Sequence, residues 1–208
     1  MEDRAQAVKQ ERVASWSDIG AREATLVQRC AQRDEIACAE LVAEHQRMVI
    51  QLAVNLLDDR DEALDVSQEV FLRVFRTIHR FRGQSSLRTW IYRIAVNQTR
   101  NRHRFWRRRR RADQVSLDDH VSAHGELPSN AQATPEHVLE QKELGARLQR
   151  ALNSLPFDQR TAIVLREIDG LSYDEIAFSL GVAIGTVKSR LTRARLALRQ
   201  QLREDRTP

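Results

Sequence analysis

Apolar residues recur at helical spacing along most of the chain, and clear apolar–polar alternation typical of strands does not occur. An amphipathic stretch over Arg22–Gln32 is followed by a longer one that reaches Leu56. Turn-forming residues at Asp58–Asp61 then favour a break. A third apolar stripe runs from Ala63 to Ile78. This pattern predicts an all-α fold.

A fourth helix is predicted from Leu87 into a run of arginines. Its apolar positions indicate one face packed on a core, and they are Leu87, Trp90, Ile91, Ile94 and Ala95. Eight arginines occur in the twelve residues Arg100–Arg111. Such dense positive charge favours a polyanionic partner, and nucleic acid is the first candidate.

The composition changes after Arg111. Residues 112–140 contain six acidic residues, two prolines and no Lys or Arg. They hold too few apolar residues to build a core. We therefore expect two small helical domains, residues 22–111 and 141–203, joined by a flexible acidic linker, with tails at 1–21 and 204–208.

The second domain contains two helices around a glycine turn. Ser172 and Glu175 have capping-box spacing at the start of one helix. Gly181 suits the left-handed position at its end, and a last helix is predicted to begin at Thr186. A basic, polar start to that helix is typical of helix-turn-helix proteins, whose second helix enters the major groove of DNA. A solvated basic face on a structural helix is the alternative interpretation.

The remaining composition argues against a membrane protein, a metalloprotein and an enzyme. The formal charge is +5 over 208 residues, and no apolar run is long enough to span a membrane. The six histidines have no ligand spacing with Cys30 or Cys38, which we interpret as small buried thiols in a reducing cytoplasm. We therefore expect no catalytic residues, no metal and no cofactor.

Three segments resemble a known family. LSYDEIAFSLGVAIGTVKSRLTRARLAL resembles region four of sigma-70-family factors, and FRGQSSLRTWIYRIAVNQTRN resembles their region two. Asp61–Phe75 resembles the part of region two that grips the core polymerase, and the short chain resembles the extracytoplasmic-function (ECF) group. The resemblance implies a cytoplasmic transcription initiation factor that binds core RNA polymerase and promoter DNA. It also implies an anti-sigma factor as a partner, which could tether the chain to a membrane without insertion.

The resemblance also assigns site residues. The residues expected to contact core polymerase are Asp61, Asp65, Gln68, Glu69 and Arg73. The residues expected to bind the minus-ten element, from a base-capturing loop and the helix after it, are Phe81, Arg82, Ser85, Tyr92, Arg93, Asn97 and Arg100. The residues expected at the minus-thirty-five element are Thr186, Lys188, Ser189, Arg190, Thr192 and Arg193. Phe71 and Trp90 are interpreted as core, Tyr92 and Arg93 as nearer the exposed side, and Arg190 could equally brace the domain.

Two other functions remain open at this stage. An autonomous helix-turn-helix regulator would explain Ser172–Leu202 but would leave the acidic side of Asp61–Phe75 without a purpose. An RNA-binding protein built on the arginine run would leave the helix-turn-helix unexplained.

Overall fold

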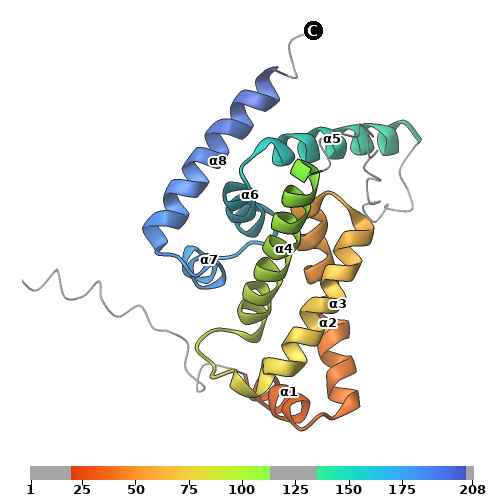
Figure 1. The fold of residues 1–208 in the computed structure, drawn as a ribbon, viewed down its shortest axis with the longest axis vertical. Helices are drawn as coiled ribbons and strands as arrows, with labels where there is room; N and C mark the ends of the chain where they lie inside the picture. Colours follow the sequence, from red (N-terminus) through yellow and green to blue (C-terminus); the bar gives the residue numbers. More distant parts are fainter. Residues whose placement is uncertain (1–19, 113–134, 205–208) are drawn as a thin grey trace, which may run out of the picture.

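The computed structural model describes residues 20–112 and 135–204, and every regular element in these ranges is helical (Figure 1). The all-α prediction is therefore confirmed. The elements of the first half are α1 (Ala21–Ala31), α2 (Glu35–Leu57), α3 (Arg60–Thr77), the short 3₁₀ turn η1 (Ile78–Arg80) and α4 (Leu87–Ala112). Those of the second half are α5 (Pro135–Ser154), α6 (Phe157–Ile163), the π-helical turn η2 (Val164–Ile168), α7 (Tyr173–Leu180) and α8 (Ile184–Glu204).

Aspartates set the helix boundaries of the first half. The Asp34 carboxylate accepts hydrogen bonds from the backbone amides of Ile36 and Ala37, which caps α2. Asp58 ends α2 in the left-handed conformation (φ 57°), and Asp59 caps α3 by accepting from Glu62 N. The predicted break at Asp58–Asp61 is therefore confirmed.

Capping also defines the second half. Ser172 and Glu175 form the predicted capping box, and Gly181 has the predicted left-handed conformation with φ 64°.

Two helix boundaries differ from the prediction. Helix α5 starts at Pro135, inside the expected linker, because proline suits the first turn of a helix. Helix α8 starts at Ile184 rather than Thr186, since the Ala183 carbonyl already accepts from the Thr186 and Val187 amides. The rest of the expected linker and both tails lie outside the described residues.

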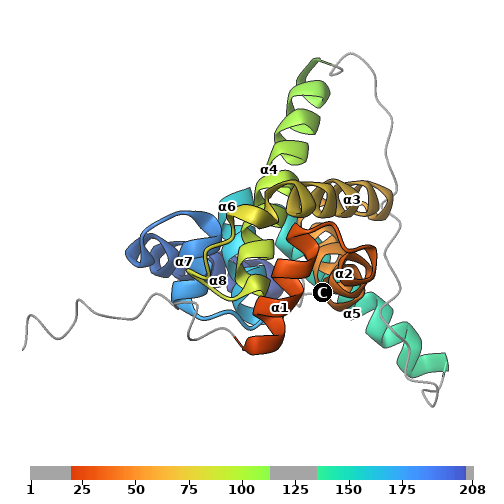
Figure 2. The same cartoon turned by 90° about the horizontal axis from the view of Figure 1, so that it is seen from below.

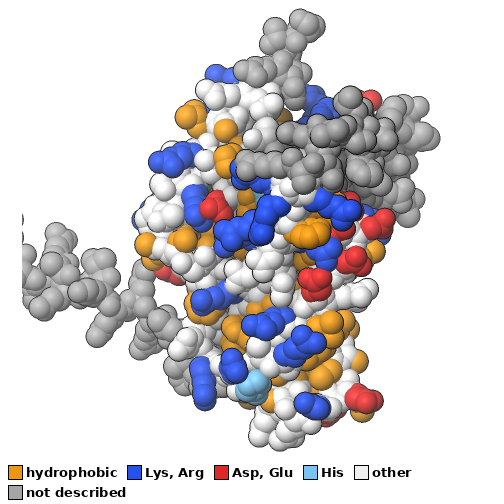
Figure 3. All heavy atoms as spheres, in the orientation of Figure 1, with side chains coloured by type: hydrophobic (Ala, Val, Ile, Leu, Met, Phe, Trp, Pro, Cys, Tyr) orange, Lys and Arg blue, Asp and Glu red, His pale blue; other side chains and the backbone are white. Residues whose placement is uncertain are grey.

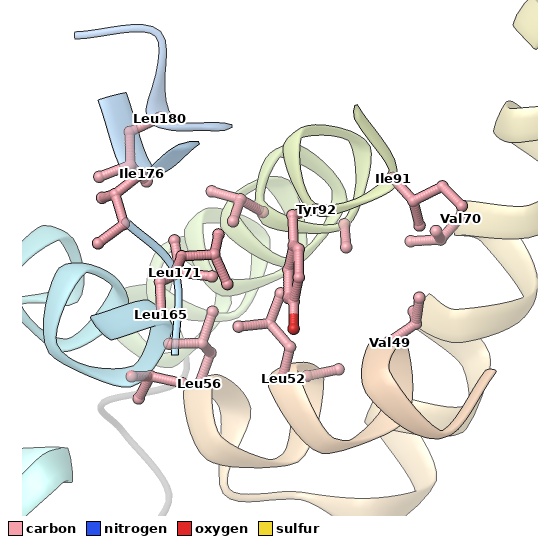
Figure 4. Close-up of a cluster of buried hydrophobic side chains, with 14 of the residues drawn as sticks. Val49, Leu52, Leu56, Val70, Ile91, Tyr92, Leu165, Leu171, Ile176 and Leu180 are labelled. Carbon is pink, nitrogen blue, oxygen red and sulfur yellow. The ribbon is translucent and has the colours of Figure 1, made fainter. Parts of the chain in front are cut away.

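The two halves share one hydrophobic core. Leu52 and Leu56 of α2 and Tyr92 of α4 pack beside Leu165 and Leu171 of the second half (Figure 4). All five side chains are less than 2% exposed. The two predicted helical units are both present, and they are packed against each other.

Polar groups reinforce this junction. Arg160 of α6 is buried and donates to the Leu56 carbonyl at 3.0 Å, as well as to Asn153 O and Oδ1 at its own side. Asn153 in turn donates from its side-chain amide to the Asp58 carboxylate. Because burying a guanidinium without hydrogen bonds is costly, these contacts fix the second half against the end of α2.

Candidate nucleic-acid interface

The loop between η1 and α4 is held by hydrogen bonds where it enters α4. Ser86 caps α4, accepting from Thr89 N at 3.1 Å, while the Glu23 carboxylate of α1 accepts from Leu87 N. Gly83 is buried and has φ 67°, a conformation that favours glycine. These contacts hold residues 81–86 on the surface of the first half as an ordered loop.

Phe81, which the resemblance places at the minus-ten element, is buried rather than open to a ligand. It is 5% exposed and packs against Trp90, with 5.4 Å between ring centroids. Arg82 is exposed and Ser85 is half-buried, donating to the Ser86 carbonyl. Gln84, which the sequence analysis did not select, is exposed at the same loop, and its amide can pair with base edges. The side chains that this loop offers to a ligand are therefore polar.

Helix α4 is covered on two sides. It packs against α2 and α3 on one side and α7 on the other. Ile91 and Tyr92 therefore both point inward, and the prediction that Tyr92 lies nearer the exposed side is wrong: Tyr92 is 1% exposed. Arg93 and Asn97 are exposed, and the Arg93 guanidinium lies 5.1 Å from the Phe178 ring centroid.

Tyr92 meets a buried carboxylate from the second half. Its hydroxyl hydrogen-bonds the side chain of Asp169, and burial raises the pKa of Tyr92. Burial also raises the pKa of Asp169 to about 6, although the Tyr92 hydrogen bond and the Arg88 charge oppose this shift. Arg88 additionally donates to the Asp169 carbonyl at 3.1 Å. Tyr92 therefore packs in the junction between the two halves and is not open to a ligand.

The basic end of α4 leaves the body of the molecule. Figure 2 shows this end of the helix extending beyond the other helices. Arg104, Arg107 and Arg108 are exposed, and Phe105 is 53% exposed. Arg109 stacks on Trp106 at 5.8 Å. Exposed guanidinium groups on a projecting helix can contact phosphates of any sequence.

The exposed face of α3 is acidic and partly apolar. Asp61, Asp65, Gln68 and Arg73 are exposed, whereas Glu69 pairs with Arg102 of α4 at 2.6 Å. Acidic side chains gather over the first turns of α3, and Lys and Arg side chains are spread across the rest of this view (Figure 3). Phe71 is buried, as predicted.

Two leucines lie on the same exposed face of α3. Leu64 is 39% and Leu72 55% exposed, and they are eight residues apart, so Leu64, Gln68 and Leu72 form one stripe. The sequence analysis missed them because apolar residues on an amphipathic helix are assigned to the core by default. We name Asp61, Leu64, Asp65, Gln68 and Leu72 the α3 face. It combines the charge and the apolar area that a protein interface requires.

Helices α7 and α8 form the predicted helix-turn-helix. Val187 and Leu191 anchor α8 in the core, which leaves its other side in solvent. The exposed residues on the first turns of α8 are Thr186, Lys188, Ser189, Thr192 and Arg193. Arg190 instead braces the fold, since its guanidinium contacts the Asp158 carboxylate at 2.9 Å. Five of the six predicted α8 residues are thus free to meet a ligand from one side of the helix.

The two cysteines differ in how deeply they are buried. Cys30 is buried, as predicted, but Cys38 is half-buried and lines an open hollow with Val42 and Phe75. Burial, followed by the neighbouring Cys38, raises the pKa of Cys30 to about 12.

The described residues show neither a metal-binding cluster nor a membrane-spanning helix. In residues 20–112 and 135–204, His, Cys, Asp and Glu form no group of three or more able to hold a metal ion. No helix of this described part of the chain has the length and apolar character to cross a membrane.

Comparisons with known proteins agree with this geometry. The family model "Sigma-70 region 2" matches residues 41–112, and "Sigma-70, region 4" matches residues 145–198. The first match covers most of α2 to α4, and the second covers the helix-turn-helix.

Full-length relatives match over most of their length. The RNA polymerase sigma-H factor of Pseudomonas aeruginosa is 38% identical over 178 residues, which is 85% of this chain and 92% of that protein. The ECF RNA polymerase sigma-E factor of Escherichia coli K12 is 38% identical over 173 residues, 83% of this chain and 90% of that protein. The sigma factor RpoE of Bartonella quintana, solved in complex with the anti-sigma factor NepR, is 28% identical with a TM-score of 0.60, covering 81% of this chain and 98% of that one. The chain therefore belongs to the sigma-70 family of RNA polymerase sigma factors, in its ECF group, and is an alternative sigma factor.

Proposed function

We propose that this sigma factor binds core RNA polymerase through the α3 face, directs it to promoters through α8, and starts melting at the minus-ten element. The observation that carries the proposal is that one chain combines two exposed basic surfaces, on α4 and on the helix-turn-helix, with the exposed acidic and apolar α3 face. Each element supports one step of initiation.

The α3 face supports polymerase binding. Asp61 and Asp65 offer negative charge to a basic partner, and Leu64 and Leu72 offer apolar area beside it. Glu69 and Arg73 flank this face; Glu69 is held by Arg102, so it contributes as part of an ion pair.

The first turns of α8 support recognition of the minus-thirty-five element. Lys188 and Arg193 can donate to guanine acceptors or to phosphates. Thr186, Ser189 and Thr192 are short enough to let the helix approach the base edges closely. Arg190 positions the helix through Asp158.

The loop at residues 81–86 and α4 support capture of a flipped minus-ten base. Removing a base from the stack costs a few kcal/mol, so polar groups must recover that energy. Arg82, Ser85 and Asn97 provide them, with Gln84 added by the structure, and Phe81 holds the loop from beneath. Arg93 and Arg100 supply positive charge along the same helix.

The chain would work without a catalytic group, in the cytoplasm, where core polymerase and promoter DNA are found. An anti-sigma factor would be a further partner. The Bartonella quintana relative in complex with NepR supports that assignment. Such a partner could also tether the chain to a membrane.

Reconstituted transcription tests the proposal. A genomic fragment library transcribed with core polymerase should give discrete start sites only when this chain is added. An autonomous helix-turn-helix regulator is the competing function, and it would bind specific fragments tightly without core polymerase. Tight specific binding by the chain alone, with no new start sites, would reject the sigma function.

A further inference from the structure

The two cysteines of the chain meet where α1 turns into α2. Cys30 lies in the last turn of α1 and Cys38 in the first turn of α2. Between them the chain reverses, since the Asp34 amide donates to the Arg29 carbonyl at 3.1 Å and the Cys38 amide donates to the Asp34 carbonyl at 2.9 Å. This turn brings the side chains of Cys30 and Cys38 together, and they are hydrogen-bonded to each other.

Ion pairs on both sides of the turn hold the two helices in this arrangement. Arg29 of α1 contacts the Asp34 carboxylate at 2.8 Å, and Arg22 of α1 contacts the Glu40 carboxylate of α2 at 3.1 Å. Cys30 belongs to the hydrophobic core of the first half, and Cys38 packs against that core. The thiols are therefore neighbours in the folded chain without any movement of α1.

Only one of the two thiols is accessible to a small molecule. Cys30 is 3% exposed, whereas Cys38 is half-buried at an open hollow between α2 and α3. The other residues that line this hollow are Ala39, Val42, Ala43, Gln46 and Phe75. A small, uncharged oxidant such as hydrogen peroxide can enter a hollow of this apolar character, so it meets Cys38 first.

The buried thiol is suited to react second. Burial, followed by the charge and the hydrogen bond of Cys38, raises the pKa of Cys30 to about 12. Because the thiolate is the nucleophile, Cys30 is a poor first reactant at neutral pH. Once Cys38 has become a neutral sulfenic acid, its charge no longer opposes ionisation of Cys30. Cys30 then lies beside the sulfur that it has to attack.

We propose that Cys38 and Cys30 form a modification site for hydrogen peroxide, which converts the two thiols to a disulfide joining α1 to α2. The Cys38 thiolate attacks one peroxide oxygen: an S–O bond forms, the O–O bond breaks, and the departing hydroxide becomes water with the Cys38 proton. Cys30 then attacks the Cys38 sulfur: the S–S bond forms, the S–O bond breaks, and the departing hydroxide becomes a second water with the Cys30 proton. The two thiols lose two electrons, and the peroxide accepts them.

The disulfide would fix α1 in place. Helix α1 supports the start of α4, because the Glu23 carboxylate accepts from the Leu87 amide. In a reducing compartment the pair is in the thiol form at rest, and a dithiol reductant returns it to that form after oxidation. The bond is therefore a reversible tether on a helix that holds the loop before α4. None of these steps depends on the proposed function.

Peptide mapping of the oxidised full-length chain tests the proposal. The reduced protein is treated with hydrogen peroxide, its remaining thiols are blocked with N-ethylmaleimide, and it is digested with trypsin without reductant. Trypsin cleaves after Arg33, between the cysteines, so the disulfide joins the peptides Cys30–Arg33 and Asp34–Arg47. We expect this joined pair in monomeric protein, and its loss after dithiothreitol. Two separately blocked or over-oxidised peptides, or a disulfide found only between two copies of the chain, would overturn the proposal.

Single variants test the order of the two steps, and each is the control for the other. In Cys30→Ala, Cys38 should form a sulfenic acid that dimedone traps, because no second thiol is present to displace it. In Cys38→Ala, loss of the remaining thiol to peroxide should be at least about tenfold slower, since Cys30 is buried and protonated. Far-UV circular dichroism establishes that both are folded. Equal rates would contradict the assignment of Cys38 as the first reactant, and the wild-type peptide map decides the site even if one variant does not fold.

Hydrogen exchange of the wild type, reduced and oxidised, measures the tether. Amides of α1 should exchange about tenfold more slowly in the oxidised protein, because local opening of α1 is restricted by the new bond. Amides of α8, which lies in the other half, should exchange equally in both forms and serve as the internal control. Unchanged exchange of α1 in a protein that carries the disulfide would reject the tether.

Discussion

Asn97 and Tyr92 lie little more than one turn apart on α4 but have different surroundings. Asn97 is exposed, whereas Tyr92 is enclosed by α2, α7 and Asp169. A side chain must reach solvent to pair with a base, so Asn97 is the stronger candidate for base capture. For the same reason, Tyr92 and Phe81 support the site from beneath.

Asn97→Ala should slow open-complex formation on a duplex promoter by about tenfold, the effect of losing one or two hydrogen bonds. The defect should be smaller on a template already melted at the minus-ten element, because there the base is already unpaired and no free energy is needed to flip it out of the duplex. Potassium permanganate footprinting over time measures both. Asn101→Ala, one turn further along, is the control; equal defects on the two templates would contradict a role in melting.

The protonation of Asp169 makes the stability of the folded chain depend on pH. Its pKa in the folded chain is raised from 3.8 to about 6, so between these values the unfolded chain loses a proton that the folded chain keeps. The stability associated with the protonated carboxyl is complete below pH 4 and lost as the pH rises through 6. Asp169→Asn should therefore be more stable than wild type at pH 7 by about 1–3 kcal/mol.

Urea unfolding at pH 4 and pH 7 measures this difference, which should nearly vanish at the lower pH. Asp174→Asn, which removes an exposed carboxylate of α7, is the matched control. A constant difference at both pH values would mean that Asp169 does not titrate between them.

At the scale of elements, caps and turns define the two surfaces on which the proposed function depends. The turn between α7 and α8 needs a left-handed residue at Gly181, and α3 owes its start to Asp59. The Gly181 turn fixes the angle of α8, and the Asp59 cap fixes the start of α3. The first can be tested by measuring stability, and the exposed face of α3 by measuring binding.

Gly181→Ala should destabilise the chain by about 1–2 kcal/mol, the cost of a left-handed conformation with a Cβ atom. An added Cβ meets no atom within 4 Å at Gly181 or at Gly185, so steric crowding does not differ between the sites. Gly185 has no positive φ, and Gly185→Ala should be neutral or stabilise α8 by up to about 1 kcal/mol. Chemical denaturation compares the two; an equal loss would argue against backbone strain as the cause.

Asp61→Arg/Asp65→Arg should lower the affinity for core polymerase at least about tenfold, because the α3 face would repel a basic partner. Glu69 is left unchanged since its exchange would also break the Arg102 ion pair. The control, Glu44→Arg/Asp174→Arg, makes the same charge change at exposed acids of α2 and α7. Co-purification with core polymerase is the measurement, and undiminished recovery of the variant would place polymerase elsewhere.

The molecule as a whole behaves as one packed body because its halves bury apolar side chains against each other. Leu56 and Tyr92 are covered by Leu165 and Leu171, and Arg160 donates a hydrogen bond to the Leu56 carbonyl beside them. Separation of the halves must therefore expose apolar surface to water, which costs free energy.

The shared core predicts one cooperative unfolding transition. Of the three tryptophans, Trp90 and Trp106 lie in α4 and Trp16 lies outside the described residues. Fluorescence of Trp90 and Trp106 reports the first half, while far-UV circular dichroism reports helices of both halves. The two probes should give coincident urea curves. Curves with separate midpoints would show that the halves unfold independently.

The sequence by itself determined the helices, most of their ends and the polarity of their exposed faces, because periodicity and capping are local properties. The α7–α8 turn and the break at Asp58–Asp61 are examples. Only the tertiary structure decided which helix covers which face. Tyr92 and Arg190 are polar residues on helices and look available in sequence. In the fold, however, Tyr92 is buried beside Asp169 and Arg190 pairs with Asp158, and both partners are more than thirty residues away along the chain. Which residues remain open to DNA depends on long-range packing between the halves, and no local pattern encodes it.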